Sequence, residues 1–123
     1  MKEKIEKLLS FVGRPYEKTN NDGTYQGCFY PVQFLYPQLP KFRMPDTDIK
    51  SACDFASKKI EEICQNISPS ELKEGDIIKT NFKDVLHVAI YLGFGKIIHV
   101  FENNTLQIGR LKMFRNFQSF RVK

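Results

Sequence analysis

The spacing of the apolar residues changes near residue 66, and this change constrains the fold more than any other feature of the sequence. Before it the spacing is helical. Apolar residues from Ile5 to Val12 predict a first helix, which Gly13 and Pro15 end. Two further helices are predicted over residues 29–36 and 48–65, with irregular chain at 16–27 and 37–46. The apolar stripe of the longest helix contains Ile49, Ala52, Cys53, Ala56, Ile60 and Ile63.

After this point the chain consists of short β-branched segments separated by turn residues. The segments "GDIIKT", "LHVAIYLG", "KIIHVF" and "LQIGRL" predict consecutive strands, and "SFRVK" is expected to add an edge strand. Helices followed by an antiparallel meander indicate the α+β class. The 123 residues contain no repeat and no linker, so we expect one domain over residues 1–123.

The net charge of +5 is spread along the chain rather than clustered. No basic run alternates with aromatic residues, so nucleic acid is not an expected partner. We interpret the charge as a solvated surface, with attraction to an anionic partner such as a cell wall as the alternative. No large apolar stripe is left over, and a monomer is therefore expected.

The N-terminal segment "MKEKIEKLL" lacks the continuous apolar run of a signal peptide. No window reaches the roughly 20 apolar residues that a membrane span requires. The sequence therefore predicts a soluble chain that is cytoplasmic as synthesised. Three cysteines without a C-x-x-C pair argue against a disulfide framework and against a zinc knuckle.

Cys28 differs from the other two cysteines in its setting. Cys53 lies on the apolar stripe of the longest predicted helix and Cys64 lies near its end, positions typical of inert packing thiols. Cys28 follows Gly27 and directly precedes a predicted helix. The N–H groups and partial positive charge of a helix N-terminus lower a thiol pKa and can hold an oxyanion. Cys28 is therefore a candidate nucleophile, and a small hydrophobic residue in a turn is the alternative.

The two histidines, His87 and His99, fall on adjacent strands of one predicted hairpin. A single histidine on an apolar strand is usually a core residue, but two on neighbouring strands indicate a site. A three-residue loop over residues 93–95, with a glycine in the left-handed conformation, places both side chains on one face. In that register His87 lies opposite Phe101 and His99 opposite Ala89, so the imidazoles are diagonal neighbours. A loop with an even number of residues would place them on opposite faces.

Cys28, His87 and His99 together have the chemistry of a catalytic triad. Cys28 would attack a carbonyl carbon and His87 would be its general base. His99 would fix the tautomer of His87 and stabilise its cationic form. A zinc site made of the same three residues is the alternative, although nothing local favours it.

Several motifs, taken in order, resemble those of the NlpC-type family of papain-like cell-wall cysteine peptidases. Residues 11–42 contain a "G-x-P-Y" turn, a Gly/Asn-rich loop and a cysteine that opens a helix. "LKEGDIIKT" resembles the family's "L-x-x-G-D-hydrophobic" entry to its first strand, and "HVAIYLGFGKIIHV" resembles its paired histidine strands. The resemblance covers nearly the whole chain.

The resemblance implies a small papain-like α+β fold in which the cysteine-bearing helix packs on the antiparallel sheet. It implies Cys28 as nucleophile, His87 as base and His99 as third member, with no metal or organic cofactor. Tyr16 matches a tyrosine that lines the site near the oxyanion, and a loop aromatic that caps the core is the alternative. Typical members cut amide bonds in peptidoglycan stem peptides through an acyl-enzyme, often next to D-glutamate, so such a peptide is the expected substrate.

The sequence departs from the family pattern on both sides of Cys28. Members usually carry "D-C-S-G" or, in a branch tied to phage tail assembly, "D-C-aromatic-G", whereas this chain has Gly27-Cys28-Phe29-Tyr30. The missing acid weakens the expectation that the site recognises a free amino end. The aromatic after the cysteine and the "LP" after the helix favour the phage-tail branch. That branch would place the chain in a virion, or require export by a non-classical route, with phage tail or envelope proteins as partners.

Two alternative functions follow from the same resemblance. One is a tail or envelope component that keeps the fold for assembly or binding and is catalytically weak or inactive. The other is an amidase, thioesterase or acyltransferase of the same fold that acts on a substrate outside the cell wall.

Overall fold

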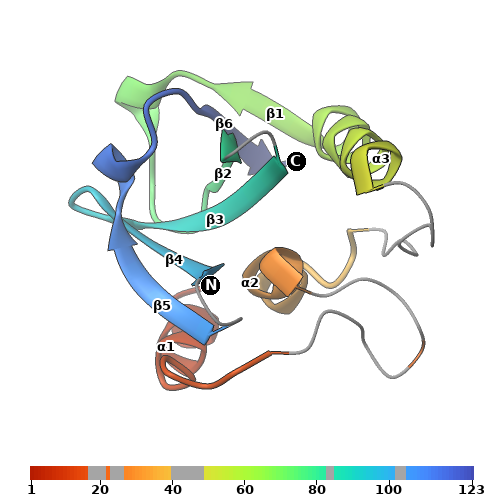
Figure 1. The fold of residues 1–123 in the computed structure, drawn as a ribbon. Coiled ribbons are helices and arrows are strands. Elements are labelled where there is room, and N and C mark those ends of the chain that lie inside the picture. The colour runs from red at the N-terminus through yellow and green to blue at the C-terminus, as the bar shows by residue number, and fades with distance from the viewer. Residues whose placement is uncertain (17–21, 23–26, 40–48, 83–84, 102–104) are drawn as a thin grey trace.

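The computed structural model describes residues 1–16, 22, 27–39, 49–82, 85–101 and 105–123. Its helices are α1 (Lys2–Leu9), α2 (Tyr30–Leu35) and α3 (Ile49–Ile63), with short 3-10 turns η1 (Gly27–Phe29), η2 (Pro69–Glu71) and η3 (Leu111–Met113). Its strands are β1 (Cys64–Ile67), β2 (Ile77–Phe82), β3 (Val85–Gly93), β4 (Lys96–Phe101), β5 (Thr105–Arg110) and β6 (Gln118–Val122). Helices come first and strands follow, so the predicted α+β class is confirmed (Figure 1). None of the helices in these residues is long and apolar enough to cross a membrane.

The strands form one antiparallel sheet in the order β1-β6-β2-β3-β4-β5. Strands β2 to β5 make the predicted meander. The prediction of an edge strand at residues 119–123 is wrong, because β1 pairs with the outer side of β6, from Cys64 opposite Val122 to Ile67 opposite Ser119. β1 is buried only at its two ends, so it lacks the alternation that identifies a strand. Its first residues extend the helical pattern, which is why α3 was predicted to run to residue 65 although it ends at Ile63.

Two apolar clusters lie on opposite faces of the curved sheet. Helices α1, α2 and α3 lie along one face (Figure 1), which we call the helix face; its core residues include Leu8, Leu35, Ile60, Val88, Ile90, Ile98 and Phe120. The other, which we call the η3 face, has a smaller cluster of Ile78, Ala89, Ile97 and Phe114. Side chains alternate along a strand, so His87 lies on the η3 face with Ala89, and His99 lies there with Ile97.

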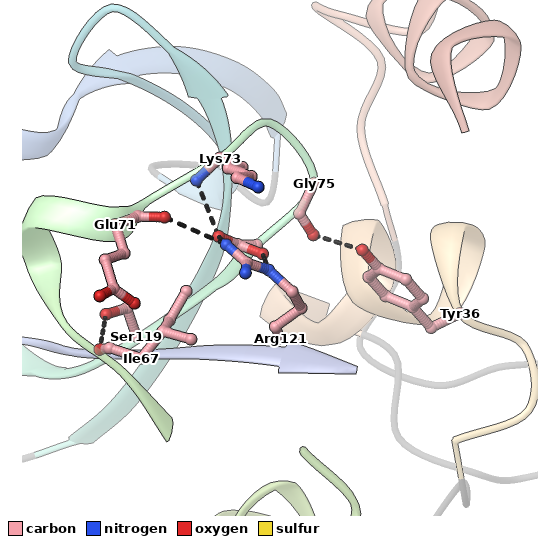
Figure 2. Close-up of polar contacts among 8 residues, drawn as sticks. Tyr36, Ile67, Glu71, Lys73, Gly75, Ser119 and Arg121 are labelled. Atoms are coloured by element: carbon pink, nitrogen blue, oxygen red, sulfur yellow. Dashed lines mark hydrogen bonds and ion pairs between the residues drawn. The ribbon is translucent and has the colours of Figure 1, made fainter. Parts of the chain in front are cut away.

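The buried carboxylate of Asp76 fixes the entry to β2 through its contacts with Lys73 and Arg121. Figure 2 labels these two partners. The Asp76 carboxylate accepts hydrogen bonds from the backbone N–H of Lys73 at 2.8 Å and from Nε and Nη2 of Arg121 at 2.9 and 2.8 Å. The hydroxyl of Tyr36, directly after α2, donates to the carbonyl of Gly75. Gly75 and Asp76 are the "GD" pair that the sequence predicted at the entry to this strand. Asp76 therefore links β2 to β6, and Gly75 links it to the end of α2.

Candidate active site

Cys28 lies in η1, directly before α2. Gly27 has a φ of 40°, in the left-handed region that favours glycine, and this conformation turns the chain into the helix. The Sγ atom of the half-buried Cys28 lies 4.0 Å from the carbonyl oxygen of Leu86, the residue directly before His87 on β3. The structure thus places the candidate nucleophile against the strand that carries the candidate base.

The helix that follows Cys28 is too short to give the strong stabilisation of a thiolate that the sequence predicted. Because α2 has six residues, few aligned peptide dipoles stand behind the thiol. The partial charge that a helix N-terminus offers a thiolate is correspondingly small. The short helix alone therefore gives the Cys28 thiol little activation.

His87 and His99 are joined by a hydrogen bond of 2.8 Å between Nε2 of His87 and Nδ1 of His99. The two side chains share one face of the β3–β4 hairpin, so the predicted placement on one face is confirmed. Both are buried, with 7% of His87 and 1% of His99 exposed. A buried imidazole pair of this kind has a fixed mutual orientation.

The hairpin has the predicted register but a different turn. Ile90 pairs with Ile98, as the three-residue loop predicted. Gly93, however, pairs with Lys96, which leaves a two-residue turn at 94–95 in which both residues have positive φ. A β-bulge just before Gly93 absorbs the extra residue and keeps the histidines in register.

The surroundings of the two imidazoles are aromatic. The Phe101 ring stacks on His99 with centroids 5.1 Å apart, and Phe114 meets His87 and His99 edge-on at 5.7 and 6.1 Å. Burial lowers the pKa of both histidines to about 4, and repulsion from His99 adds to the lowering for His87. Both imidazoles are therefore uncharged at neutral pH, which is the state that a general base requires.

The hydrogen bond between the imidazoles involves Nε2 of His87, so Nδ1 is the nitrogen of that ring that could act as a base. This role requires the tautomer in which Nε2 of His87 donates to Nδ1 of His99. In that tautomer His99 carries its own hydrogen on Nε2. A Cβ atom at Gly109 would lie 3.1 Å from that Nε2, so the β5 backbone closes the far side of His99. The sequence analysis did not identify Gly109 and Phe114. Their positions beside the histidines depend on how β5 and η3 pack in the folded protein.

Tyr16 packs beside the segment that carries Cys28. Its ring stacks on Tyr30 with centroids 3.8 Å apart and planes 25° apart, and Pro15 forms a bridge with Thr105 on β5. Burial, and then a hydrogen bond to Tyr16, raise the pKa of Tyr30. A contact between Tyr16 and substrate stays a prediction.

Cys64 differs from Cys28 in its burial. Cys64 begins β1, is 3% exposed, and burial raises the pKa of its thiol, as expected for a packing residue. The side chain of Cys53 lies outside the described residues. Within the described part of the chain, no three His, Cys, Asp or Glu side chains gather closely enough to hold a metal ion.

Comparisons with solved structures identify the fold. The chain is similar to the NlpC/p60 domain of the peptidoglycan hydrolase SagA, with 22% identity, a TM-score of 0.61, and coverage of 98% of this chain and 95% of that one. It is similar to RipD from Mycobacterium tuberculosis, described as a non-catalytic NlpC/p60 domain protein adapted to peptidoglycan binding, with 18% identity, a TM-score of 0.62, and coverage of 98% and 93%. A Staphylococcus aureus protein described as similar to a lipoprotein of the NLP/P60 family has 21% identity, a TM-score of 0.61, and coverage of 97% and 40%. These similarities confirm the papain-like α+β fold.

Sequence comparison identifies the family. No curated protein matches the chain. The model of the NlpC/P60 family matches residues 13–119, a range that contains Cys28, His87 and His99. The resemblance inferred from the ordered motifs is confirmed, and the chain belongs to the NlpC/P60 family.

Proposed function

We propose that the chain is a cysteine hydrolase that cleaves amide bonds in peptidoglycan stem peptides. Cys28 is the nucleophile, His87 the base and His99 the residue that orients the base. The observation that supports this most is the buried His87–His99 hydrogen bond on the strand against which the Cys28 thiol lies. Membership of the NlpC/P60 family, which includes a domain of a peptidoglycan hydrolase among the similar structures, supports the substrate class.

The first half of the proposed reaction acylates Cys28. Nδ1 of His87 takes the thiol proton as sulfur attacks the amide carbon, and the carbonyl π electrons move to oxygen. The tetrahedral intermediate then collapses. Its C–N bond breaks as His87 returns the proton to the leaving nitrogen, which departs as an amine. A thioester between Cys28 and the acyl group remains.

The second half hydrolyses the thioester. Nδ1 of His87 takes a proton from water as the water oxygen attacks the thioester carbon. The tetrahedral intermediate collapses with cleavage of the C–S bond, and His87 returns the proton to sulfur, which releases a carboxylic acid and regenerates the thiol. In both halves His87 is transiently cationic. His99, whose pKa burial lowers to about 4, stays neutral and so remains an acceptor for the Nε2–H of His87.

Tyr16 has a supporting role in this proposal. Tyr16 and Tyr30 share a side-chain hydrogen bond, and a Tyr16 hydroxyl that accepts from Tyr30 has its own proton left to donate. That proton would bind a substrate carbonyl or the oxyanion. Tyr30 stands where family members usually have glycine, so the stacked pair also narrows the space beside Cys28.

A second candidate function is peptidoglycan binding without cleavage. It is supported by the similarity to RipD, described as non-catalytic, and by the departures from the family pattern at Gly27 and Tyr30. A tail or envelope component of the phage-tail branch would belong to this class. An activity on a different amide or an ester is the third candidate.

Digestion of purified peptidoglycan tests these functions against one another. The wild type, Cys28→Ala and the control Cys64→Ala are incubated with it, and released fragments are identified by mass spectrometry. We expect the wild type and the control to release peptide fragments, with one new amino end and one new carboxyl end for each bond cleaved. Cys28→Ala should release none. Binding of the wild type to peptidoglycan without release would favour the binding component. Neither binding nor release would point to a substrate outside the cell wall.

A further inference from the structure

The turn between β3 and β4 holds a phenylalanine in a strained backbone conformation. Phe94 has a φ of 52° and Gly95 a φ of 75°. A two-residue turn with positive φ at both positions favours Asn-Gly, whereas a bulky side chain is rare in the left-handed region. Phe94 is also fully exposed (102%), so burial of its ring does not offset the strain. Residue type and backbone conformation therefore conflict at this turn, and such conflicts are typical of functional sites.

Two hydrogen bonds hold the turn in this conformation. The N–H of Gly95 donates to the hydroxyl of Tyr91 at 3.0 Å, and the carbonyl of Gly95 accepts from the N–H of Leu111 in η3 at 2.8 Å. The second bond joins the turn to η3, and Figure 1 shows these two segments at the side of the molecule away from α2 and α3. The exposed Phe94 is therefore carried by a backbone that is fixed from two sides.

Three basic residues lie beside this phenylalanine. Phe94, Lys96, Arg110 and Lys112 line one hollow of about 560 Å³. Within the described part of the chain, no acidic residue lines this hollow, and none of the three cations is in an ion pair. Lys96 and Arg110 are direct partners across β4 and β5, and like charges in this arrangement destabilise a sheet. The fold therefore accepts a second local cost next to the strain at Phe94.

The net charge of the chain comes from the same part of the sequence. Residues 1–84 contain thirteen basic and thirteen acidic residues, whereas residues 85–123 contain six basic residues and one acidic residue. The positive charge is therefore not spread along the chain, as the sequence analysis expected. Three of those six basic residues line the hollow beside Phe94.

From these observations we propose that Phe94, Lys96, Arg110 and Lys112, which we call the turn patch, bind the surface of an anionic phospholipid membrane. Basic side chains attract the anionic headgroups, and an exposed aromatic ring gains free energy by entering the boundary between headgroups and acyl chains. A soluble polyanion would attract the cations but would give no reason for the exposed, strained Phe94. This peripheral contact does not depend on the proposed hydrolase function.

Sedimentation of the protein with sucrose-loaded vesicles tests the proposal. One set of vesicles contains phosphatidylcholine alone, and the other contains an equal mixture of phosphatidylcholine and phosphatidylglycerol. We expect the wild type to bind the mixed vesicles at least about tenfold more tightly than the neutral ones, and added salt to weaken this binding.

Phe94→Asn tests the aromatic part of the turn patch. Asparagine is favoured at this turn position, so urea unfolding should show that the variant is at least as stable as the wild type. Its binding to the mixed vesicles should nevertheless fall about fivefold, because the apolar contact is lost. Phe55→Asn, which changes an exposed phenylalanine on α3, is the matched control and should bind as the wild type does.

The double variant Lys96→Gln/Lys112→Gln tests the charged part of the turn patch. Each cation near an anionic surface contributes a factor of about five, so binding to the mixed vesicles should fall about 25-fold. Lys2→Gln/Lys4→Gln removes the same charge from two exposed positions on α1 and is the matched control, with an expected change of less than about fivefold.

Three results would overturn the proposal. The first is a wild type that does not prefer the mixed vesicles, and the second is equal binding by the turn-patch variants and their controls. The third is binding of the wild type to soluble polyphosphate as tightly as to the mixed vesicles, with Phe94→Asn changing neither. The partner would then be an anionic polymer rather than a membrane.

Discussion

Nε2 of His87 lies 2.8 Å from Nδ1 of His99, in a place that solvent hardly reaches. In the proposed reaction His87 takes a proton at Nδ1, and His99 stabilises the resulting cation through the existing hydrogen bond. Burial opposes this protonation, because it disfavours the charged form of both imidazoles. The cost of protonation is measurable.

The stability of the protein should fall in a defined pH window because of these two residues. Burial lowers each pKa from its ordinary value of 6.5 to about 4. Between these values the unfolded chain binds protons that the folded imidazoles do not, so the free energy of unfolding decreases as the pH falls from 6.5 to 4. The loss is on the order of 3 kcal/mol for each imidazole.

Urea unfolding at pH 7, 5.5 and 4.5 measures this loss. The double variant His87→Gln/His99→Gln is the control, since it keeps every other titratable group of the wild type. We expect a shallower decrease of stability in the double variant. Identical pH dependence in the two proteins would show that the imidazoles are not buried in their neutral form.

Gly109→Ala should disturb the imidazole pair from the side of β5. The new Cβ would lie 3.1 Å from His99 Nε2 and 3.2 Å from Met113 Sδ, closer than side chains normally pack. We expect kcat to fall about tenfold, because a small misplacement of an orienting group has effects of this size or larger. The ¹⁵N chemical shifts of the imidazoles should change as well. Ile108→Ala, an exposed neighbour on the same strand, is the control and should leave both readouts unchanged.

Gly27→Asp should destabilise the protein although it restores the acid that relatives carry before the cysteine. The φ of 40° at Gly27 is strained for any residue with a Cβ atom. The expected loss is about 1 kcal/mol, measured as the free energy of unfolding, and Gly27→Ala should lose as much. If Gly27→Asp were as stable as the wild type and Gly27→Ala were not, the new carboxylate would be making a stabilising contact that offsets the backbone strain.

Asp76→Asn should lower the melting temperature by roughly 5–10 °C, since it removes a buried charge that holds Arg121 and Lys73. Glu62→Gln is the matched control. Its partner Lys59 lies 3.4 Å away and both side chains are largely exposed, so this ion pair adds little stability. Equal shifts of the melting temperature in the two variants would mean that the Asp76 network does not anchor β2.

The sequence predicts the parts of the fold in which one local pattern dominates. The meander follows from β-branched segments with turn residues between them, and the face shared by His87 and His99 follows from hairpin register. β1 could not be predicted, because burial only at Cys64 and Ile67 gives no strand period. Its pairing with β6 depends on contacts between distant parts of the chain, and so the position of β6 inside the sheet was missed.

The candidate site, like the fold, could be predicted from the sequence only in part. Its candidate reactive groups were predicted from residue type, order and strand alternation. The supporting groups were not, because Phe114 and Gly109 reach the imidazoles only once η3 and β5 are folded around them.

The rate at which Cys28 reacts with iodoacetamide at pH 7 tests the central claim most directly, with the modified thiol identified by peptide mass spectrometry. If His87 activates Cys28, this thiol should react at least about a hundredfold faster than Cys64, whose pKa burial raises. His87→Ala should remove most of that difference. Equal and slow reaction of Cys28 and Cys64 in the wild type, unchanged in His87→Ala, would contradict the assignment of Cys28 as an activated nucleophile.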